Sequence, residues 1–262
     1  MKPYSAVFEE IHNDIPILRS AMDVPSGTLA VIADEDHQFG EGVFSLAGEC
    51  SLDSLPNFSK IPDAPPPVLK LYRGGDVPLL IVHSKPRLET GYDVKGITYP
   101  IRLLGQMGIR SVLFIERAHP VDGEVQGGGG LFLIEDHVNF TGLNPLVGPN
   151  HEAWGPRFPD MSCPYDPLLS ESLARAAAGT GVRLKKAVYA GFHPNQLVDR
   201  SVYAAHMRKS GATIAGSSLV QEVIVARHMG IRVCALAHAS MHSGVFPAEL
   251  VRFLMKEMSG LD

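Results

Sequence analysis

Cysteine is scarce in this sequence. Only Cys50, Cys163 and Cys234 occur among its 262 residues. An odd number of widely spaced cysteines provides neither a disulfide framework nor a CxxC zinc pattern. The 11 histidines include no HExxH pair. We therefore expect reduced thiols, a cytoplasmic protein and no metal site.

Long apolar runs and excess positive charge are also absent. The apolar stretches have only the length of strands, and the N-terminal MKPYSAVFEEIHNDI turns acidic without the apolar core of a signal peptide. The formal net charge is −5, which disfavours a surface for nucleic acid. We expect no membrane and no nucleic-acid partner.

Helix and strand patterns alternate along the chain. An amphipathic helix is predicted over 4–19 and a buried strand over Leu29–Ala33. The proline-rich region 50–78 predicts a loop and a hairpin before a strand that ends near His83. Four later segments, starting near residues 95, 166, 199 and 217, each run from helix through glycine to strand, and a last helix covers about 247–258. This order predicts one α/β domain over residues 1–262 with a largely parallel sheet.

Four consecutive glycines, Gly127–Gly130, raise the question of a phosphate-binding loop. Dinucleotide loops place G-x-G-x-x-G between a strand and a helix, and a Walker loop needs Gly-Lys-Ser/Thr. Here the glycines precede the strand-like run LFLI, and no helix pattern follows. We predict a turn that enters a strand over Leu131–Glu135.

Three segments carry a family resemblance. Residues 133–169, LIEDHVNFTGLNPLVGPNHEAWGPRFPDMSCPYDPLL, contain Asp136-His137, Asn139, N-P-L-x-G-P-N and R-F-P-x-M-S-x-x-Y-D. Residues 217–233, SSLVQEVIVARHMGIRV, and residues 89–114 match further motifs. These segments resemble the trimeric purine nucleoside phosphorylase family over roughly residues 80–235. The resemblance implies a phosphorylase-type single domain with a mixed central sheet flanked by helices, a homotrimer, and a small nucleoside-like substrate. Phosphate is then a possible co-substrate, with no other cofactor.

The resemblance assigns phosphate-binding roles to Lys85, Arg87 and Ser218. Lys85 and Arg87 stand where the family has an arginine and a histidine, although the same loop also fits an ordinary charged surface. Ser218 matches a serine that touches phosphate, but with Gln221 it also forms a capping-box pattern. The family's G-S-G phosphate turn is replaced here by an acidic turn that includes Glu35, and its carboxylates either repel phosphate or point into solvent.

Ionisable residues replace several other family positions. Glu89 replaces a tyrosine that lines the ribose, and E-R-A-H-P at 116–120 replaces N-A-A-G-G. Carboxyl ends of strands are where open α/β sheets bind ligands. The candidate catalytic residues are therefore Glu89, Glu116, His119, His238 and His242, although a histidine at a strand end also fits a structural role.

The candidate substrate-binding residues complete the predicted site. They are Asn195, Gln196, Ser217, Met241 and Phe158. Asp199 nearby is interpreted as a helix N-cap. Phe158 matches an aromatic residue that the family inserts into the neighbouring subunit's sugar pocket, or else it is a core residue.

Three functions remain open on these residues. The first is a divergent nucleoside phosphorylase-like enzyme, a pentosyltransferase whose standard purine phosphorolysis is weak or lost. The second is a non-catalytic trimeric scaffold or binding protein. The third is unrelated acid-base chemistry on a small molecule by Glu116, His119 and His238.

Overall fold

The computed structural model describes most of the chain. The described residues are 4–33, 44–74, 77–121, 130–194, 200–238, 250, 252 and 255–256. Gly127–Gly129 and most of the helix expected near 247–258 lie outside them. Among the described residues, no helix is both long enough and apolar enough to cross a membrane.

Helices and strands follow one another in the predicted order. The strands are β1 (Leu29–Ala33), β2 (Ser45–Ser51), β3 (Val68–Arg73), β4 (Leu79–His83), β5 (Ser111–Arg117), β6 (His119–Pro120), β7 (Leu131–Asn139), β8 (Leu184–Gly191), β9 (Ile214–Gly216) and β10 (Arg232–His238). The helices are α1 (Tyr4–Ala21), α2 (Val94–Gln106), α3 (Pro167–Gly179), α4 (Arg200–Lys209) and α5 (Leu219–His228), with short 3-10 turns η1 (Leu52–Ser54) and η2 (Leu88–Thr90).

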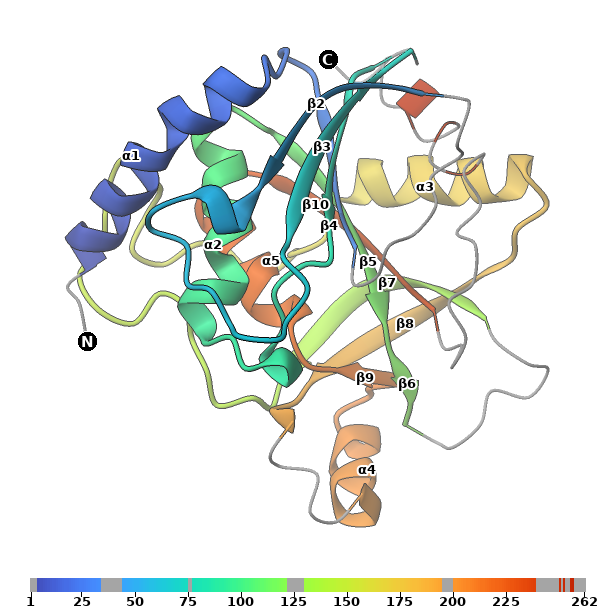
Figure 1. Cartoon of the computed structure of the whole chain (residues 1–262). Coiled ribbons are helices and arrows are strands. Elements are labelled where there is room, and N and C mark those ends of the chain that lie inside the picture. The colour runs from blue at the N-terminus through green and yellow to red at the C-terminus, as the bar shows by residue number, and fades with distance from the viewer. Residues whose placement is uncertain are drawn as a thin grey trace.

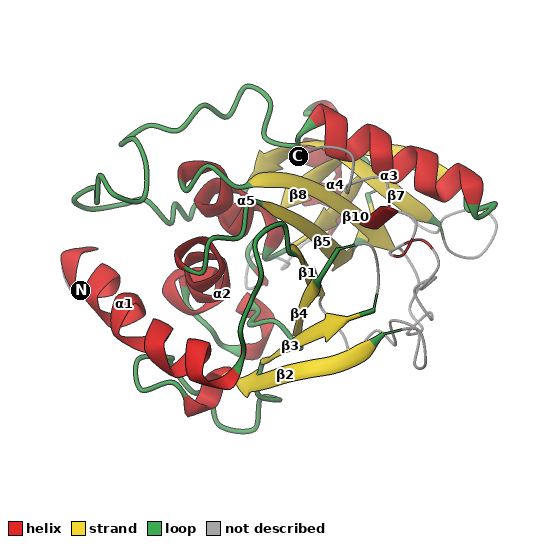
Figure 2. Cartoon of the chain, turned by 90° about the horizontal axis from the view of Figure 1, so that it is seen from above, coloured by secondary structure: helices red, strands yellow, loops and turns green. Residues whose placement is uncertain are grey.

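All described strands form one mixed sheet in the order β2-β3-β4-β1-β5-β10-β7-β8-β9-β6. The strands β4, β1, β5 and β10 are parallel to one another, while β7 runs antiparallel to β10. The predicted α/β class and mixed sheet are confirmed. Helices α1, α2 and α5 cover one face and α3 covers the other (Figures 1 and 2).

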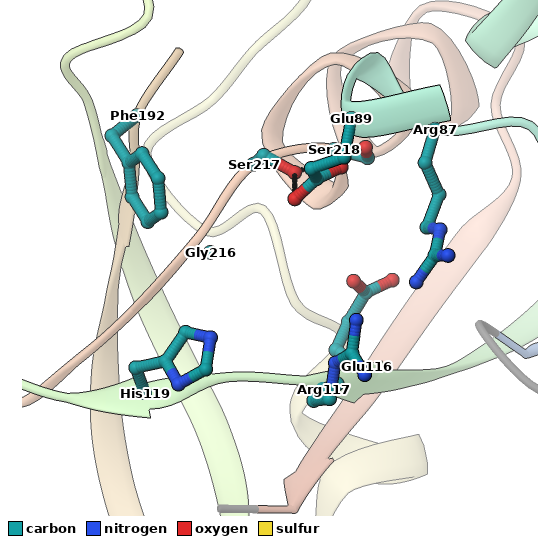
Figure 3. Close-up of a pocket in the computed structure, with 9 residues that line it drawn as sticks. All are labelled: Arg87, Glu89, Glu116, Arg117, His119, Phe192, Gly216, Ser217 and Ser218. Carbon is teal, nitrogen blue, oxygen red and sulfur yellow. Dashed lines mark hydrogen bonds between the residues drawn. The ribbon is translucent and has the colours of Figure 1, made fainter. Parts of the chain in front are cut away.

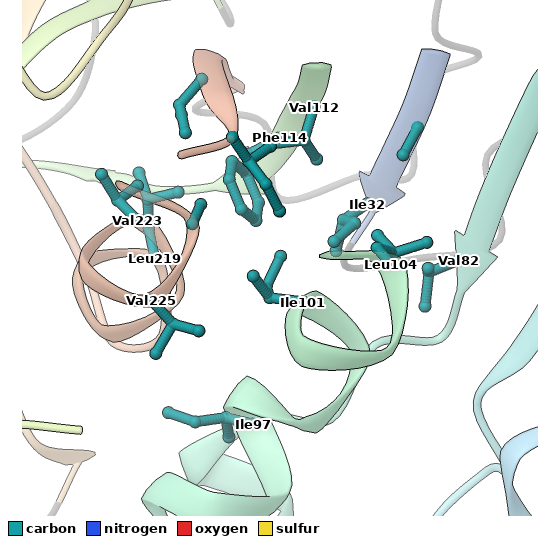
Figure 4. Packing of buried hydrophobic residues seen from close by; sticks show 14 of the residues in the cluster. Ile32, Val82, Ile97, Ile101, Leu104, Val112, Phe114, Leu219, Val223 and Val225 are labelled. Atoms are coloured by element: carbon teal, nitrogen blue, oxygen red, sulfur yellow. The ribbon is translucent and has the colours of Figure 1, made fainter. Parts of the chain in front are cut away.

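Central strands supply side chains to both faces in turn. Ile32 and Phe114 pack against α2 and α5 (Figure 4), whereas Val31 and Ile115 join the cluster that includes α3. Because both faces are covered, β1 is a continuous apolar run in which all five residues are buried.

Helix boundaries follow local chemistry. The carboxylate of Asp93 accepts the Gly96 N–H at 2.8 Å at the start of α2. Asp166 does the same for Leu169 at 3.0 Å, and Pro167 occupies the first turn of α3.

Two details of the strand predictions were incomplete. β7 starts at Leu131 as predicted but continues to Asn139 rather than Glu135. Polar residues continue the strand because β7 pairs with β8 along its length. The sequence analysis missed β2, an edge strand whose side chains are mostly exposed and therefore lack an apolar pattern.

Candidate functional site

A pocket lies beyond the carboxyl ends of β5 and β9. It is lined by Arg87, Glu89, Glu116, Arg117, His119, Phe192, Gly216, Ser217 and Ser218 (Figure 3). The described residues enclose about 30 Å³, enough for one or two water molecules. A nucleoside would therefore extend beyond this cavity. Six of the 13 residues predicted from sequence as site residues line it: Arg87, Glu89, Glu116, His119, Ser217 and Ser218. Arg117 also lines the pocket, although the sequence analysis assigned it no role.

Two serines join the turn before α5 to the loop around η2. The Leu88 N–H donates to Ser218 Oγ at 3.3 Å, and the Ser217 hydroxyl donates to the carboxylate of Glu89. The two serine hydroxyls are 3.4 Å apart. These contacts hold loop segments that are more than 120 residues apart in sequence on one wall of the pocket (Figure 3).

The capping box that the sequence offered as an alternative role for Ser218 does not form. Ser218 has φ −112° and ψ −23°, and its side chain makes no capping hydrogen bond to α5. An N-cap residue normally has extended backbone geometry, which aims its oxygen at the first turn. Gln221 instead donates from Nε2 to Thr141 Oγ1 at 2.7 Å. The Ser218 hydroxyl therefore belongs to the pocket wall rather than to a helix cap.

Lys85 lies behind the pocket in a buried ion cluster. Its Nζ donates to the carboxylate of Glu116, and to Glu222 Oε2 at 2.6 Å. Only Glu116 of these three residues lines the pocket. Their exposed fractions are 2% for Lys85, 2% for Glu116 and 0% for Glu222. Lys85 is thus near the site that the sequence suggested, but carboxylates surround its ammonium group.

Two arginines and one histidine also line the pocket. Arg87 is half-buried, whereas Arg117 and His119 are exposed. The Arg87 side chain points into the same cavity as Glu116 (Figure 3). The pocket therefore combines two guanidinium groups with the carboxylates of Glu89 and Glu116, a mixture that suits a polar ligand with both donor and acceptor atoms.

Tyr165, from the 133–169 segment, lies near this charge cluster. Burial raises the pKa of Tyr165 well above its usual value, and the nearby Glu116 and Asp136 carboxylates raise it further. The Tyr165 hydroxyl lies 3.1 Å from His137 Nδ1, and burial lowers the pKa of His137. Both groups are therefore neutral near pH 7.

Two further described residues that were predicted for the site, His238 and Phe158, do not line this cavity. His238 is 8% exposed at the end of β10, beside Arg117 of β5. Phe158 is 83% exposed, so its interpretation as a core residue is wrong. Asn195, Gln196, Met241 and His242 lie outside the described residues, as do Glu35 and Asp199.

Sequence reasoning missed Glu222, Phe192 and Gly216. Glu222 is an ionisable residue within the apolar pattern of α5, and that mismatch was a usable signal. Phe192 and Gly216 lie at the ends of β8 and β9 and line the pocket. No charge or motif distinguished them in the sequence.

Comparisons with known proteins agree with this architecture. The chain matches the model of the phosphorylase superfamily over residues 23–245. Purine nucleoside phosphorylase 1 of Bacillus subtilis is 30% identical over 205 residues, which cover 76% of this chain and 75% of the relative.

Solved structures show the same fold. A purine nucleoside phosphorylase from Schistosoma mansoni in complex with acetate has a TM-score of 0.81 and 21% identity, covering 97% of each chain. Isoform 2 of the S. mansoni enzyme, in complex with cytosine and ribose-1-phosphate, has a TM-score of 0.76 and 26% identity, covering 99% of this chain and 93% of that one. The chain belongs to the purine nucleoside phosphorylase family of the phosphorylase superfamily.

Proposed function

We propose that this protein cleaves the N-glycosidic bond of a nucleoside or nucleoside-like substrate. The pentosyl group passes to phosphate or to another acceptor. The convergence of Arg87, Glu89 and Ser218 on one pocket carries this proposal. These residues come from two distant segments that both resemble the family, and they meet at the edge of the sheet where such folds bind ligands.

The pocket supplies groups for both halves of the reaction. As the bond from the anomeric carbon to the base breaks, its electron pair leaves with the base and positive charge develops on the sugar. The Glu89 carboxylate is suited to stabilise that charge. An oxygen of the acceptor then bonds to the anomeric carbon, and His119, which lines the pocket, would donate a proton to the leaving base.

The remaining roles are proposed from where these residues stand relative to the family's motifs in the sequence. His238 and His242 would act with Asn195, Gln196 and Met241 on the base. Phosphate, as a possible co-substrate, would contact Arg87 and Ser218, which line the pocket. Ionisable residues at family positions, Glu116 above all, support a divergent site with weak standard phosphorolysis.

Base release from a panel of nucleosides, with and without phosphate, tests the function. We expect cleavage of at least one nucleoside, and inosine and guanosine turnover several orders of magnitude below the typical value of about 10 per second. Arg87→Ala should weaken phosphate binding at least tenfold in calorimetry, because it removes a guanidinium from the pocket. Lys186→Ala, which alters an exposed ion pair with Glu135, is the control. Absence of both cleavage and nucleoside binding would favour the scaffold.

We also propose a homotrimer in the cytoplasm. Val147 and Phe158 are 60% and 83% exposed on the segment that resembles the family most fully, and exposed apolar side chains favour a protein interface. The three cysteines are free, which suits a reducing compartment. Light scattering should give three times the mass of the chain at micromolar concentration, and Phe158→Asp should lower it. A wild-type monomer would refute the trimer.

A further inference from the structure

A buried cluster of one cation and two carboxylates adjoins the pocket. Lys85 follows β4, Glu116 lies at the end of β5, and Glu222 lies in the first turn of α5. Lys85 Nζ donates to both carboxylates, at 2.6 Å in the case of Glu222. The three side chains are 0–2% exposed, so water screens their charges little.

The cluster as a whole does not attract an anion. With all three groups ionised, its formal charge is −1, because two carboxylates share one ammonium group. Glu116 lines the pocket, whereas Lys85 and Glu222 do not. An incoming phosphate therefore meets the carboxylate before the ammonium group, and like charges at short range repel.

We propose that Glu116 determines acceptor specificity by occupying Lys85 in place of an incoming anion. It lowers the affinity of the pocket for phosphate and favours an acceptor with less negative charge. This inference rests on the proposed function only for the location of the acceptor. Of the three residues in the cluster, only Glu116 lines the pocket, so Glu116 is the one that discriminates between acceptors of different charge.

Two isosteric substitutions separate this role from a general effect of charge. Glu116→Gln and Glu222→Gln each remove one carboxylate from Lys85 and leave the other as its partner. Calorimetric titration with inorganic phosphate should show at least tenfold tighter binding for Glu116→Gln than for wild type. Glu222→Gln should change affinity less than threefold. The double variant Lys85→Met/Glu116→Gln keeps the wild-type formal charge of the cluster and should return to within threefold of wild type.

Each alternative result overturns the proposal. These results are unchanged affinity in Glu116→Gln, an equal gain in Glu222→Gln, or a gain that persists without Lys85. Thermal unfolding checks that each variant is folded, and Glu116→Asn replaces Glu116→Gln if the latter is not. Phosphate binding requires no turnover, so these outcomes remain readable even if no nucleoside is cleaved and the proposed function fails.

Discussion

The molecule buries acidic side chains in two regions and satisfies them differently. Between α1 and α2, Asp14 is fully buried and accepts hydrogen bonds from the Tyr99 hydroxyl and from Asn57 Nδ2, the latter at 3.1 Å. Beside the pocket, Glu116 and Glu222 share the ammonium group of Lys85. Neutral donors satisfy a carboxylate without adding charge. The pocket cluster instead consists of ionised groups, two carboxylates and one ammonium group. Its electrostatic energy therefore changes when an ion or a proton approaches.

Helix α5 carries an ionisable side chain near each of its ends. Its first turn carries Glu222 beside the pocket, whereas its last turn carries His228, whose Nε2 lies 3.0 Å from Asn150 Oδ1. Burial, with Arg102 and Arg157 nearby, lowers the pKa of His228 to about 4. The helix therefore has ionised groups at the ligand end and a neutral histidine at the other.

Removal of the Lys85 ammonium group should cause the largest loss in the free energy of unfolding. Lys85→Met leaves two buried carboxylates without their ammonium partner, and breaking a buried pair in this way costs about 3–5 kcal/mol. Urea unfolding should show this loss. Lys95→Met is the matched control because the Lys95–Glu10 pair is partly exposed, and its loss should cost at most about 1 kcal/mol. Equal losses in the two variants would show that the pocket cluster is not special.

Much of the fold was predictable because burial leaves a periodic signal in sequence. The strand at Leu29–Ala33 and the helix over α2 were predicted from their apolar patterns. The exposed edge strand β2 lacks such a pattern and was missed. Local pattern also offered a helix cap as the alternative role of Ser218, and that alternative is wrong because its hydroxyl accepts the Leu88 N–H from a distant loop.

The candidate site was predictable only in part. Strand ends and the family resemblance located Glu116 and Arg87 at one pocket. They did not reveal that Lys85 is held by Glu116 and Glu222, since ion pairing across three elements depends on tertiary packing. The sequence therefore identified charges at the site, but not which of them face the ligand.

A substitution in the Asp14 region should lower the stability of the fold and leave phosphate affinity unchanged. Tyr99→Phe removes one of the donors to a buried carboxylate, which costs about 1–3 kcal/mol. Burial and the hydrogen bond to Asp14 raise the pKa of the Tyr99 hydroxyl, so it stays a donor across the usual pH range. Urea unfolding measures the loss, and Tyr203→Phe on α4, outside this network, is the control. A changed phosphate affinity in Tyr99→Phe would contradict the separation of the two regions.

The smallest expected effect is the contribution of His228 to the pH dependence of the free energy of unfolding. Its pKa is about 4 in the folded protein, below the usual 6.5, so the folded state binds the proton less well than the unfolded state. Stability from neutral His228 is therefore fully present above pH 6.5 and is lost as pH falls towards 4. One pH unit within this window corresponds to about 1.4 kcal/mol for a single group, and we expect a loss of roughly 1 kcal/mol between pH 6.5 and 5.5. Urea unfolding of wild type and His228→Gln at both pH values isolates this contribution, because His137, whose pKa is also lowered by burial, remains in both proteins. Equal pH dependence in the two proteins would show that the C-terminal end of α5 does not hold its histidine neutral.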